Sequence, residues 1–196
     1  MAPADDRGAT LPDMLAALAL MALVSATTLP VVAGALDHER AMLGAQFVAA
    51  RTQYARLEAL RRGVFVALRV TLLQDDAEVQ AFVDGNGNGV LTRDIERGLD
   101  PPVEPPDRLS AHMRGVSLRV NQRVPDIGGS GWIETGSNPL RLGRTSLLSF
   151  SPTGSATAGT LYMSARRGPQ LAVRVTGATG RVRVLRFNEG ARLWLP

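Results

Sequence analysis

The sequence predicts an α+β protein, in which one long N-terminal helix is followed by antiparallel β-sheet. Three observations support this fold class. Residues 14–36 carry no charged side chain, residues 43–57 repeat apolar side chains at steps of three and four, and short segments after Gly63 alternate apolar with polar side chains. The 196 residues are enough for one modest domain in addition to such a helix.

The charge-free segment is long enough to cross a bilayer. Its residues, 14–36, would extend about 34 Å as a helix at roughly 1.5 Å per residue. Pro12 suits the first turn of a helix, where its missing N–H is not needed. Pro30 lies inside the segment and is expected to kink the helix. We therefore expect a transmembrane helix over residues 9–37.

Residues 38–62 are expected to continue this helix as an amphipathic extension. Apolar side chains form one stripe along it: Leu43, Phe47, Ala50, Tyr54 and Leu57. Gly63 is a typical residue to end a helix. We expect one helix from about Leu11 to Arg62 whose second half packs one face on a globular domain. A membrane-anchored coiled coil is the alternative.

The remaining chain, residues 63–196, is expected to form one β-rich domain. Period-two alternation is clearest over residues 64–70, 116–120 and 171–175. Clusters of Gly, Pro, Asn and Ser separate the strands, notably over residues 100–107 and 127–139. The stretches 165–169 and 177–180 are typical of hairpin turns in a C-terminal meander.

Charge is distributed unevenly along the chain, which has no cysteine and therefore neither disulfides nor thiolate metal sites. Between residues 75 and 107, nine acids stand against two arginines. From residue 108 to the end, thirteen arginines stand against three acids. This asymmetry indicates contacts between subunits or an acidic partner for the C-terminal part.

The N-terminal residues resemble the prepilin signature of type IV pilins and type II secretion pseudopilins. A polar leader, residues 1–8, ends in Gly8. If Ala9 is counted as the first residue of the mature chain, Asp13 is the fifth and Pro30 the twenty-second. The resemblance implies cleavage by a prepilin peptidase between Gly8 and Ala9, and methylation of Ala9. Ala9 and Asp13 stand where that family usually has phenylalanine and glutamate.

The resemblance also implies a role for the Asp13 carboxylate during assembly. A carboxylate at the end of a membrane helix normally has a partner. The amine of Ala9, or of the same residue in a neighbouring subunit, would neutralise Asp13 and set the register between helices. The competing interpretation is that Asp13 caps or flanks an ordinary membrane anchor.

Segments of the C-terminal domain resemble GspH/FimT-type proteins. They are the helix end at 50–63 that a strand follows directly, the strand and Asp/Asn/Gly loop at 82–89, the segment 150–161, and Gly180-Arg181-Val182-Arg183. The Gly-Trp pair that usually precedes the second of these is replaced by Val79 and Gln80.

This resemblance implies a minor pseudopilin of a type II secretion system, held by a single pass in the bacterial cell inner membrane. Its domain would lie in the periplasm or on the filament, and it would assemble with other pseudopilins into the pseudopilus for protein export. The alternative is a FimT-like minor type IV pilin that acts in pilus assembly and DNA uptake.

Four arginines are the candidate DNA-binding residues: Arg174, Arg181, Arg183 and Arg186. Arg181 and Arg183 alternate with valines, so we expect them to share one exposed strand face. Several cations on one surface suit phosphate recognition, and a Gly-Arg-x-Arg motif is thought to bind DNA in some FimT-type proteins. The competing interpretation is an edge strand that arginine protects from pairing.

The loop from Asp84 to Gly89 is the candidate metal site. Asp84, Asn86 and Asn88 fit the first half of an EF-hand-like calcium loop. Its twelfth position is Ile95 instead of glutamate, so a glycine-rich turn is the competing interpretation. We expect no other cofactor.

No residue pattern indicates an enzyme. His38 and His112 are not paired with a nucleophile, and the Gly-rich segment 128–131 lacks the strand-turn-helix setting of a hydrolase. Trp132 and Trp194 are interpreted as core or subunit-contact residues. Three functional classes remain: an assembly subunit, a DNA-uptake module, and a lone membrane-tethered domain that calcium stabilises.

Overall fold

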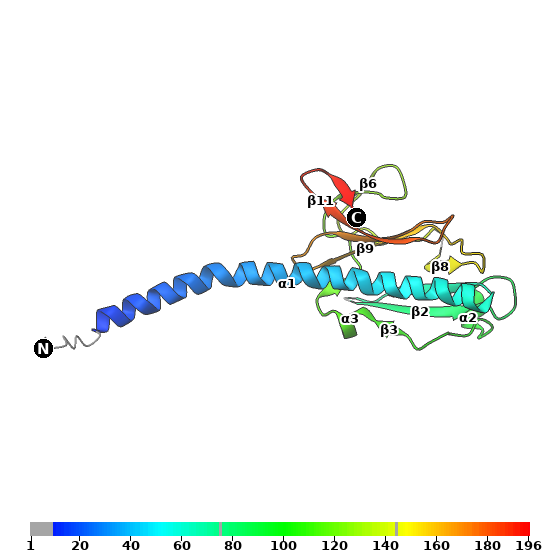
Figure 1. The fold of residues 1–196 in the computed structure, drawn as a ribbon, viewed down its shortest axis with the longest axis horizontal. Coiled ribbons are helices and arrows are strands. Elements are labelled where there is room, and N and C mark those ends of the chain that lie inside the picture. The colour runs from blue at the N-terminus through cyan, green and yellow to red at the C-terminus, as the bar shows by residue number, and fades with distance from the viewer. Residues whose placement is uncertain (1–9, 75, 144) are drawn as a thin grey trace, which may run out of the picture. The chain divides into compact units, whose positions relative to one another are not determined.

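The computed structural model describes residues 10–74, 76–143 and 145–196, with the side chains of residues 27–31 left out of the description. The chain divides into two compact units, Met1–Leu36 and Asp37–Pro196, called unit 1 and unit 2 below. Helix α1 (Leu11–Arg62) contributes residues to both units, and the strands follow in unit 2 (Figure 1). The predicted α+β class and the predicted helix bounds are confirmed.

Unit 1 exposes a run of large apolar side chains. They are between 49 and 74 % exposed: Leu11, Met14, Leu15, Leu18, Leu20, Met21, Leu23, Val24, Val32 and Leu36. Over the described side chains, which leave out residues 27–31, no helix combines the length and apolarity needed to cross a membrane. The α-helix continues through Pro30. The transmembrane helix over residues 9–37 and the kink at Pro30 stay predictions.

In the described part of unit 2, two antiparallel sheets account for most strands. A four-stranded sheet has the order β3–β2–β1–β8. Its strands are β1 (Val66–Leu72), β2 (Ala77–Val83), β3 (Asp107–Arg108) and β8 (Leu147–Phe150). Short helices α2 (Thr92–Glu96) and α3 (Leu109–His112) flank β3 in the sequence.

The second sheet has six strands in the order β12–β11–β10–β9–β4, with β7 also paired to β9. They are β4 (Val116–Ser117), β7 (Leu140–Arg141), β9 (Gly159–Ala165), β10 (Leu171–Val175), β11 (Val182–Asn188) and β12 (Leu193–Leu195). A separate ribbon pairs β5 (Val124–Pro125) with β6 (Trp132–Ile133). The meander predicted for the C-terminus is β9–β10–β11–β12.

The face of α1 that packs in the core of unit 2 differs from the predicted stripe. Its fully buried positions carry small side chains: Ala41, Gly44, Ala45, Val48, Thr52, Ala55 and Ala59. Leu43 and Leu57 of the predicted stripe are instead 46 and 55 % exposed. A Cβ added at Gly44 would lie 2.8 Å from Cγ1 of Val116 and 3.3 Å from Cε of Met163. The sheet approaches the helix too closely for large side chains, so the prediction that Leu43, Ala50 and Leu57 face the core is wrong. Phe47 of the predicted stripe does pack against the core.

A second apolar cluster lies under the C-terminal strands. It contains Val120, Val124, Ile133, Tyr162, Ala172 and Phe187, with Trp194 packed against it. The Trp194 Nε1–H donates to the Pro125 carbonyl at 2.9 Å, which agrees with the predicted core role. Trp132 is 45 % exposed, with the Arg123 guanidinium 5.0 Å from its ring centroid. Burial raises the pKa of Tyr162 to about 12.

Candidate functional site

The N-terminus of α1 is capped by the carboxylate that the sequence singled out. Thr10 donates to Asp13 Oδ2 from its backbone N–H at 3.0 Å and from its hydroxyl at 2.6 Å. This is the return half of a capping box, in which an acid three residues after the cap satisfies a free N–H. The capping interpretation of Asp13 therefore has a defined geometry. The cleavage and methylation sites, Gly8 and Ala9, lie outside the described residues.

In unit 2, α1 also presents an exposed apolar stripe. Leu43, Ala50 and Leu57 recur every seven residues and are all exposed, and Leu60 beside them is 41 % exposed. A seven-residue repeat places side chains on one helical face, which is the face that a second helix packs against. We call these four residues the α1 stripe. They lie on a different face from the alanines that hold α1 to the sheets.

The acidic segment of the sequence is largely used inside unit 2. Asp84, which follows β2, accepts backbone N–H groups from Asn86 at 3.1 Å, Gly87 at 2.7 Å and Gly89 at 2.8 Å. Asp100 accepts two more from the same region, at 3.1 and 3.0 Å. Both carboxylates are buried, 8 and 1 % exposed. They hold the turn in place through its backbone.

A third buried acid, Asp94 of α2, faces the side chains of this loop. It accepts hydrogen bonds from Asn88 Nδ2 at 3.1 Å and from Asn86 Nδ2 at 3.4 Å. Hydrogen bonding from Asn88 lowers the pKa of the Asp94 carboxyl, against the opposing effect of burial. Among the described residues, no three His, Cys, Asp or Glu side chains are grouped so as to hold a metal ion. Both carboxylate oxygens of Asp84, the candidate calcium ligand, accept hydrogen bonds from backbone N–H groups.

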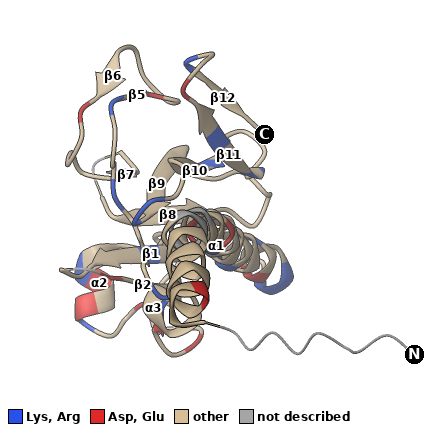
Figure 2. Cartoon of the chain, turned by 90° about the vertical axis from the view of Figure 1, so that its left-hand side faces the viewer, with Lys and Arg blue, Asp and Glu red and all other residues tan. Residues whose placement is uncertain are grey.

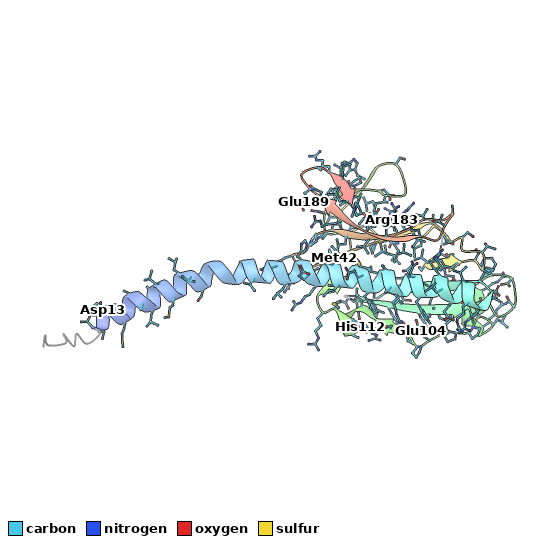
Figure 3. The ribbon with its side chains drawn as sticks, in the orientation of Figure 1. Asp13, Met42, Glu104, His112, Arg183 and Glu189 are labelled. Atoms are coloured by element: carbon cyan, nitrogen blue, oxygen red, sulfur yellow. The ribbon has the colours of Figure 1, made fainter. Side chains whose placement is uncertain are left out.

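Acids near β3 pair with α1. Arg51 contacts Glu104 Oε2 at 3.2 Å through Nη1 and Asp107 Oδ2 at 2.8 Å through Nη2. The other oxygen of Asp107 lies 2.8 Å from Nε2 of His112, whose ring stacks on Phe47 with centroids 4.4 Å apart. Figure 3 shows Glu104 and His112 on one side of this part of α1, and Arg183 and Glu189 on the other.

Strand pairing sets Arg174 of β10 opposite Arg183 of β11, but only two of the four candidate DNA-binding arginines line the same hollow. Arg181 and Arg183 line one open hollow of about 600 Å³, together with Arg56 of α1. Arg174 instead donates to Thr160 Oγ1 at 2.8 Å and lines a different hollow. Arg186 lines a third hollow. Figure 2 shows basic segments in blue along β11 and acidic ones in red at α2.

Arg56 is a cation that the sequence analysis did not include. Its Nε is buried and has no hydrogen-bond partner among the described residues. The turn before β11 lies against this side chain, since a Cβ on Gly180 would be 2.8 Å from Arg56 Nε. No local sequence signal predicts this, because the two residues lie far apart in the chain.

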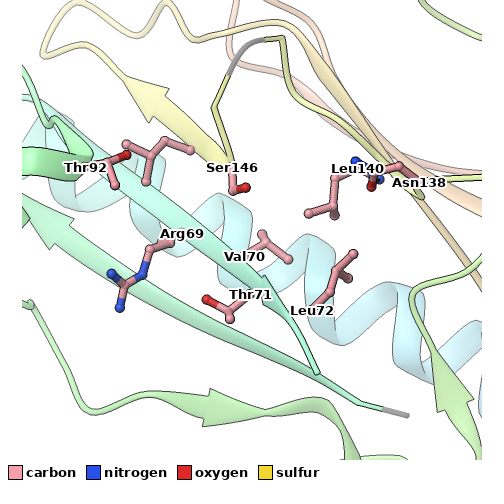
Figure 4. Close-up of a pocket in the computed structure, with 9 residues that line it drawn as sticks. Arg69, Val70, Thr71, Leu72, Thr92, Asn138, Leu140 and Ser146 are labelled. Atoms are coloured by element: carbon pink, nitrogen blue, oxygen red, sulfur yellow. Dashed lines mark hydrogen bonds between the residues drawn. The ribbon is translucent and has the colours of Figure 1, made fainter. Parts of the chain in front are cut away.

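Another hollow, of about 320 Å³, lies beside the edge of β1 (Figure 4). β8 pairs with β1 only from Val66 to Arg69. The hollow lies beyond the end of this pairing, where residues 69–72 of β1 line it. The described residues that line it include Arg69, Thr71, Asn138 and Ser146, and no carboxylate, imidazole or thiol. The hollow therefore combines a strand edge with hydroxyl and amide groups.

Comparison with known proteins finds a match to a family model. Residues 44–180 match the family model GspH, described as type II transport protein GspH. No curated protein and no solved structure matches the chain. The matched range begins within α1 and ends at the turn before β11, so it includes the acidic loop and most of both sheets. Because this match covers well over half of the chain, the protein belongs to the GspH family of type II transport proteins.

Proposed function

We propose that the protein is a minor pseudopilin that assembles with other pseudopilins into the periplasmic pseudopilus of a type II secretion system. A prepilin peptidase cleaves it between Gly8 and Ala9 and Ala9 is then methylated. The helix over residues 9–37 anchors it in the inner membrane, with the domain in the periplasm. The protein has a structural role and no catalytic one.

The exposed apolar side chains of unit 1 carry this proposal. Ten large side chains between Leu11 and Leu36 are about half exposed or more. Water disfavours such a surface, and exposed apolar areas of this size mark contacts with membrane or protein. Membership of the GspH family supports a pseudopilus as the assembly that covers it. The surface is lipid-covered before assembly and helix-covered afterwards.

The α1 stripe supports a helix-packing role that continues beyond the membrane. Leu57 and Leu43 are exposed although the core is within one helical turn of them. Helix packing at seven-residue spacing would bury both against a neighbouring pseudopilin. The stripe is therefore a second apolar contact surface, which lies in unit 2 and faces the periplasm.

The test is site-specific photo-crosslinking in cells that carry the whole secretion system. A photoreactive residue at Leu57 or Leu43 should cross-link to other pseudopilins, and one at the exposed Glu96 serves as the control. Cross-links from Glu96 that match those from Leu57 would contradict the proposed contact. A chain that lacks pseudopilin cross-links at both leucines, while secretion continues, would contradict the function itself.

DNA binding in a minor type IV pilin is the second candidate function, and the hollow lined by Arg56, Arg181 and Arg183 favours it. Arg181 and Arg183 make no ion pair among the described residues, so both are available to phosphates. A gel-shift assay should show that R181A/R183A weakens binding of a DNA duplex, whereas R123A/R192A, which removes as many charges elsewhere, does not. Equal binding by the two variants would remove this candidate.

A further inference from the structure

Five exposed arginines gather at the end of unit 2 where the chain enters it from unit 1. They are Arg40, Arg114, Arg166, Arg167 and Arg186, and we call them the arginine cluster. They come from α1, from the loop before β4, from the β9–β10 turn and from β11. No sequence segment contains more than two of them, so only the fold brings them together.

Contacts to the first turns of unit 2 place the β9–β10 turn. The backbone N–H of Arg167 donates to Asp37 Oδ2 at 3.2 Å. A Cβ on Gly168 would lie 2.9 Å from the Asp37 carbonyl oxygen and 3.2 Å from Cβ of Ala41. The turn that carries Arg166 and Arg167 therefore lies directly against α1 at residues 37–41.

Arg114, in the turn before β4, and Arg186, in β11, lie near the same end of unit 2. β4 pairs Val116 with Ala165, so the turn before β4 that carries Arg114 lies near the end of β9, where Arg166 and Arg167 follow. Arg186 lines a hollow together with His38 and Pro169. The end of β9 is held by Arg119, which donates to the Ala165 carbonyl at 2.8 Å and to Ser164 Oγ at 3.0 Å. The cluster thus has a fixed scaffold.

The cluster is poorly neutralised within the domain. Arg40 pairs with Asp37 at 3.7 Å, and its side chain is 51 % exposed. In the described ranges the other four arginines make no ion pair. The nearby carboxylates are Asp37, Glu39 and Glu189, and His38 adds a titratable group. Five guanidiniums against three carboxylates leave an excess of positive charge.

We propose that the arginine cluster binds the phosphates of anionic phospholipids on the surface of the membrane that the helix leaves. The proposal depends on the membrane anchor described under Proposed function. Asp37 directly follows Leu36, the last residue of the apolar segment, so residues 37–41 emerge at headgroup level. Guanidinium groups match phosphate oxygens with paired donors. The contact holds the domain against the membrane until the subunit enters the pseudopilus.

Charge and position favour lipid over nucleic acid as the partner of this cluster. The candidate DNA-binding arginines Arg181 and Arg183 line the hollow at Arg56. Arg56 lies about 28 Å along α1 from Asp37, at roughly 1.5 Å per residue. A membrane that begins at Leu36 would contact the arginine cluster and leave Arg181 and Arg183 in water. This pair therefore offers a control for charge.

The experiment measures how close the domain lies to the lipid surface in the full-length chain. The protein has no cysteine, so G190C provides one labelling site next to His38 and Arg186. The protein is reconstituted in phosphatidylcholine vesicles with or without phosphatidylglycerol, then labelled with a membrane-impermeant donor dye. Energy transfer to an acceptor on lipid headgroups reports the distance. R166Q/R167Q is compared with R181Q/R183Q, which removes the same charge.

Phosphatidylglycerol should increase energy transfer for the unchanged protein. Salt at about 0.5 M should reverse this increase, because it shortens the Debye length to roughly a few Å and so screens the charges. Each arginine removed from the cluster should lower the ratio of membrane-bound to free domains by roughly five-fold. R166Q/R167Q should therefore lose the lipid effect while R181Q/R183Q keeps it.

Other results would overturn the proposal. Energy transfer that is the same with both lipids, or equally reduced by the two double variants, excludes lipid binding by this cluster although the anchor holds. Binding of a DNA duplex that R166Q/R167Q abolishes, with no lipid effect, assigns the cluster to nucleic acid instead. A chain that fails to float with either vesicle after a salt wash overturns the anchor, and the lipid contact with it.

Discussion

The guanidinium of Arg51 lies 2.8 Å from the carboxylate of Asp107, joining α1 to the start of β3. Both side chains are mostly buried, 24 and 22 % exposed. Arg51 also contacts Glu104, and Asp107 also contacts His112. Removing one partner leaves the other charges unpaired in a partly dry site, which costs more than losing a surface pair.

We expect R51M to lower the free energy of unfolding by about 1–3 kcal/mol. The matched control is R108Q, which removes an exposed arginine 3.5 Å from Glu78 and should cost about 0–1 kcal/mol. Urea unfolding monitored by circular dichroism measures both. Similar losses for the two variants would contradict the buried role of Arg51.

D84A should destabilise unit 2 by about 2–4 kcal/mol, because it leaves three N–H groups of the β2–α2 loop without their acceptor. E96A changes an exposed acid in the same segment and should have little effect. Thermal melting distinguishes the two variants.

The same melts with calcium added test the candidate metal site. If calcium raises the melting temperature of the unchanged protein and D84A abolishes this rise, a calcium loop is favoured over a turn held by N–H groups.

Glu58 should make the stability dependent on pH in the acid range. Hydrogen bonds from Arg61 and then Arg62 lower the pKa of its carboxyl below the ordinary 4.5. A lowered pKa in the folded state stabilises the protein above the unfolded value and loses this effect as pH falls through the folded value. The difference in unfolding free energy between the protein and E58Q should therefore be constant at neutral pH and shrink below pH 4.5. A difference that grows on acidification would contradict the assignment.

G44V tests the close approach of α1 to the sheets. Its added atoms would meet Val116 and Met163, within 2.8 and 3.3 Å of the Cβ position. Overpacking of this kind costs about 1–3 kcal/mol. Q46V adds the same side chain to an exposed position of the same helix and provides the control. Equal melting temperatures for the two variants would show that the contact at Gly44 yields without cost.

Processing and assembly give a final pair of measurements at the N-terminus. Replacement of Gly8 by a bulkier residue should leave the leader attached, which the mass of the protein from membranes reveals. D13A should be processed and anchored but enter filaments poorly, because it lacks the carboxylate that would pair with a neighbour's amine. D13N separates charge from capping, since asparagine still accepts the Thr10 hydrogen bonds. Normal assembly of D13N would leave Asp13 only its capping role.

Local patterns in the sequence predicted several elements well. The charge-free segment, the amphipathic continuation and Gly63 predicted helix bounds that the structure confirms. The strand predicted from the alternation over residues 171–175 has the same bounds as β10. Helix periodicity and strand alternation depend on near neighbours, and Gly63 has a φ of 69° that favours glycine. Such features can be inferred from short stretches of chain.

Which face of a helix packs and which charges are free depends on residues far apart in sequence. The stripe from Leu43 to Leu57 was the natural choice by hydrophobicity, yet close approach at Gly44 selected the face of small residues. The acids between residues 76 and 107 suggested a partner, yet Glu104 and Asp107 bind Arg51, and Asp84 and Asp100 accept hydrogen bonds from loop N–H groups.

The sequence by itself determined the long helix, the β-rich domain and the resemblance to the GspH family. Only the tertiary structure decided that Arg181 and Arg183 share a hollow with Arg56, and that Arg166, Arg167 and Arg186 gather beside Asp37. The reason is physical: secondary structure follows from backbone preferences and periodicity within a few residues. A charged surface follows from strand pairing and helix packing, which join segments separated by more than a hundred residues.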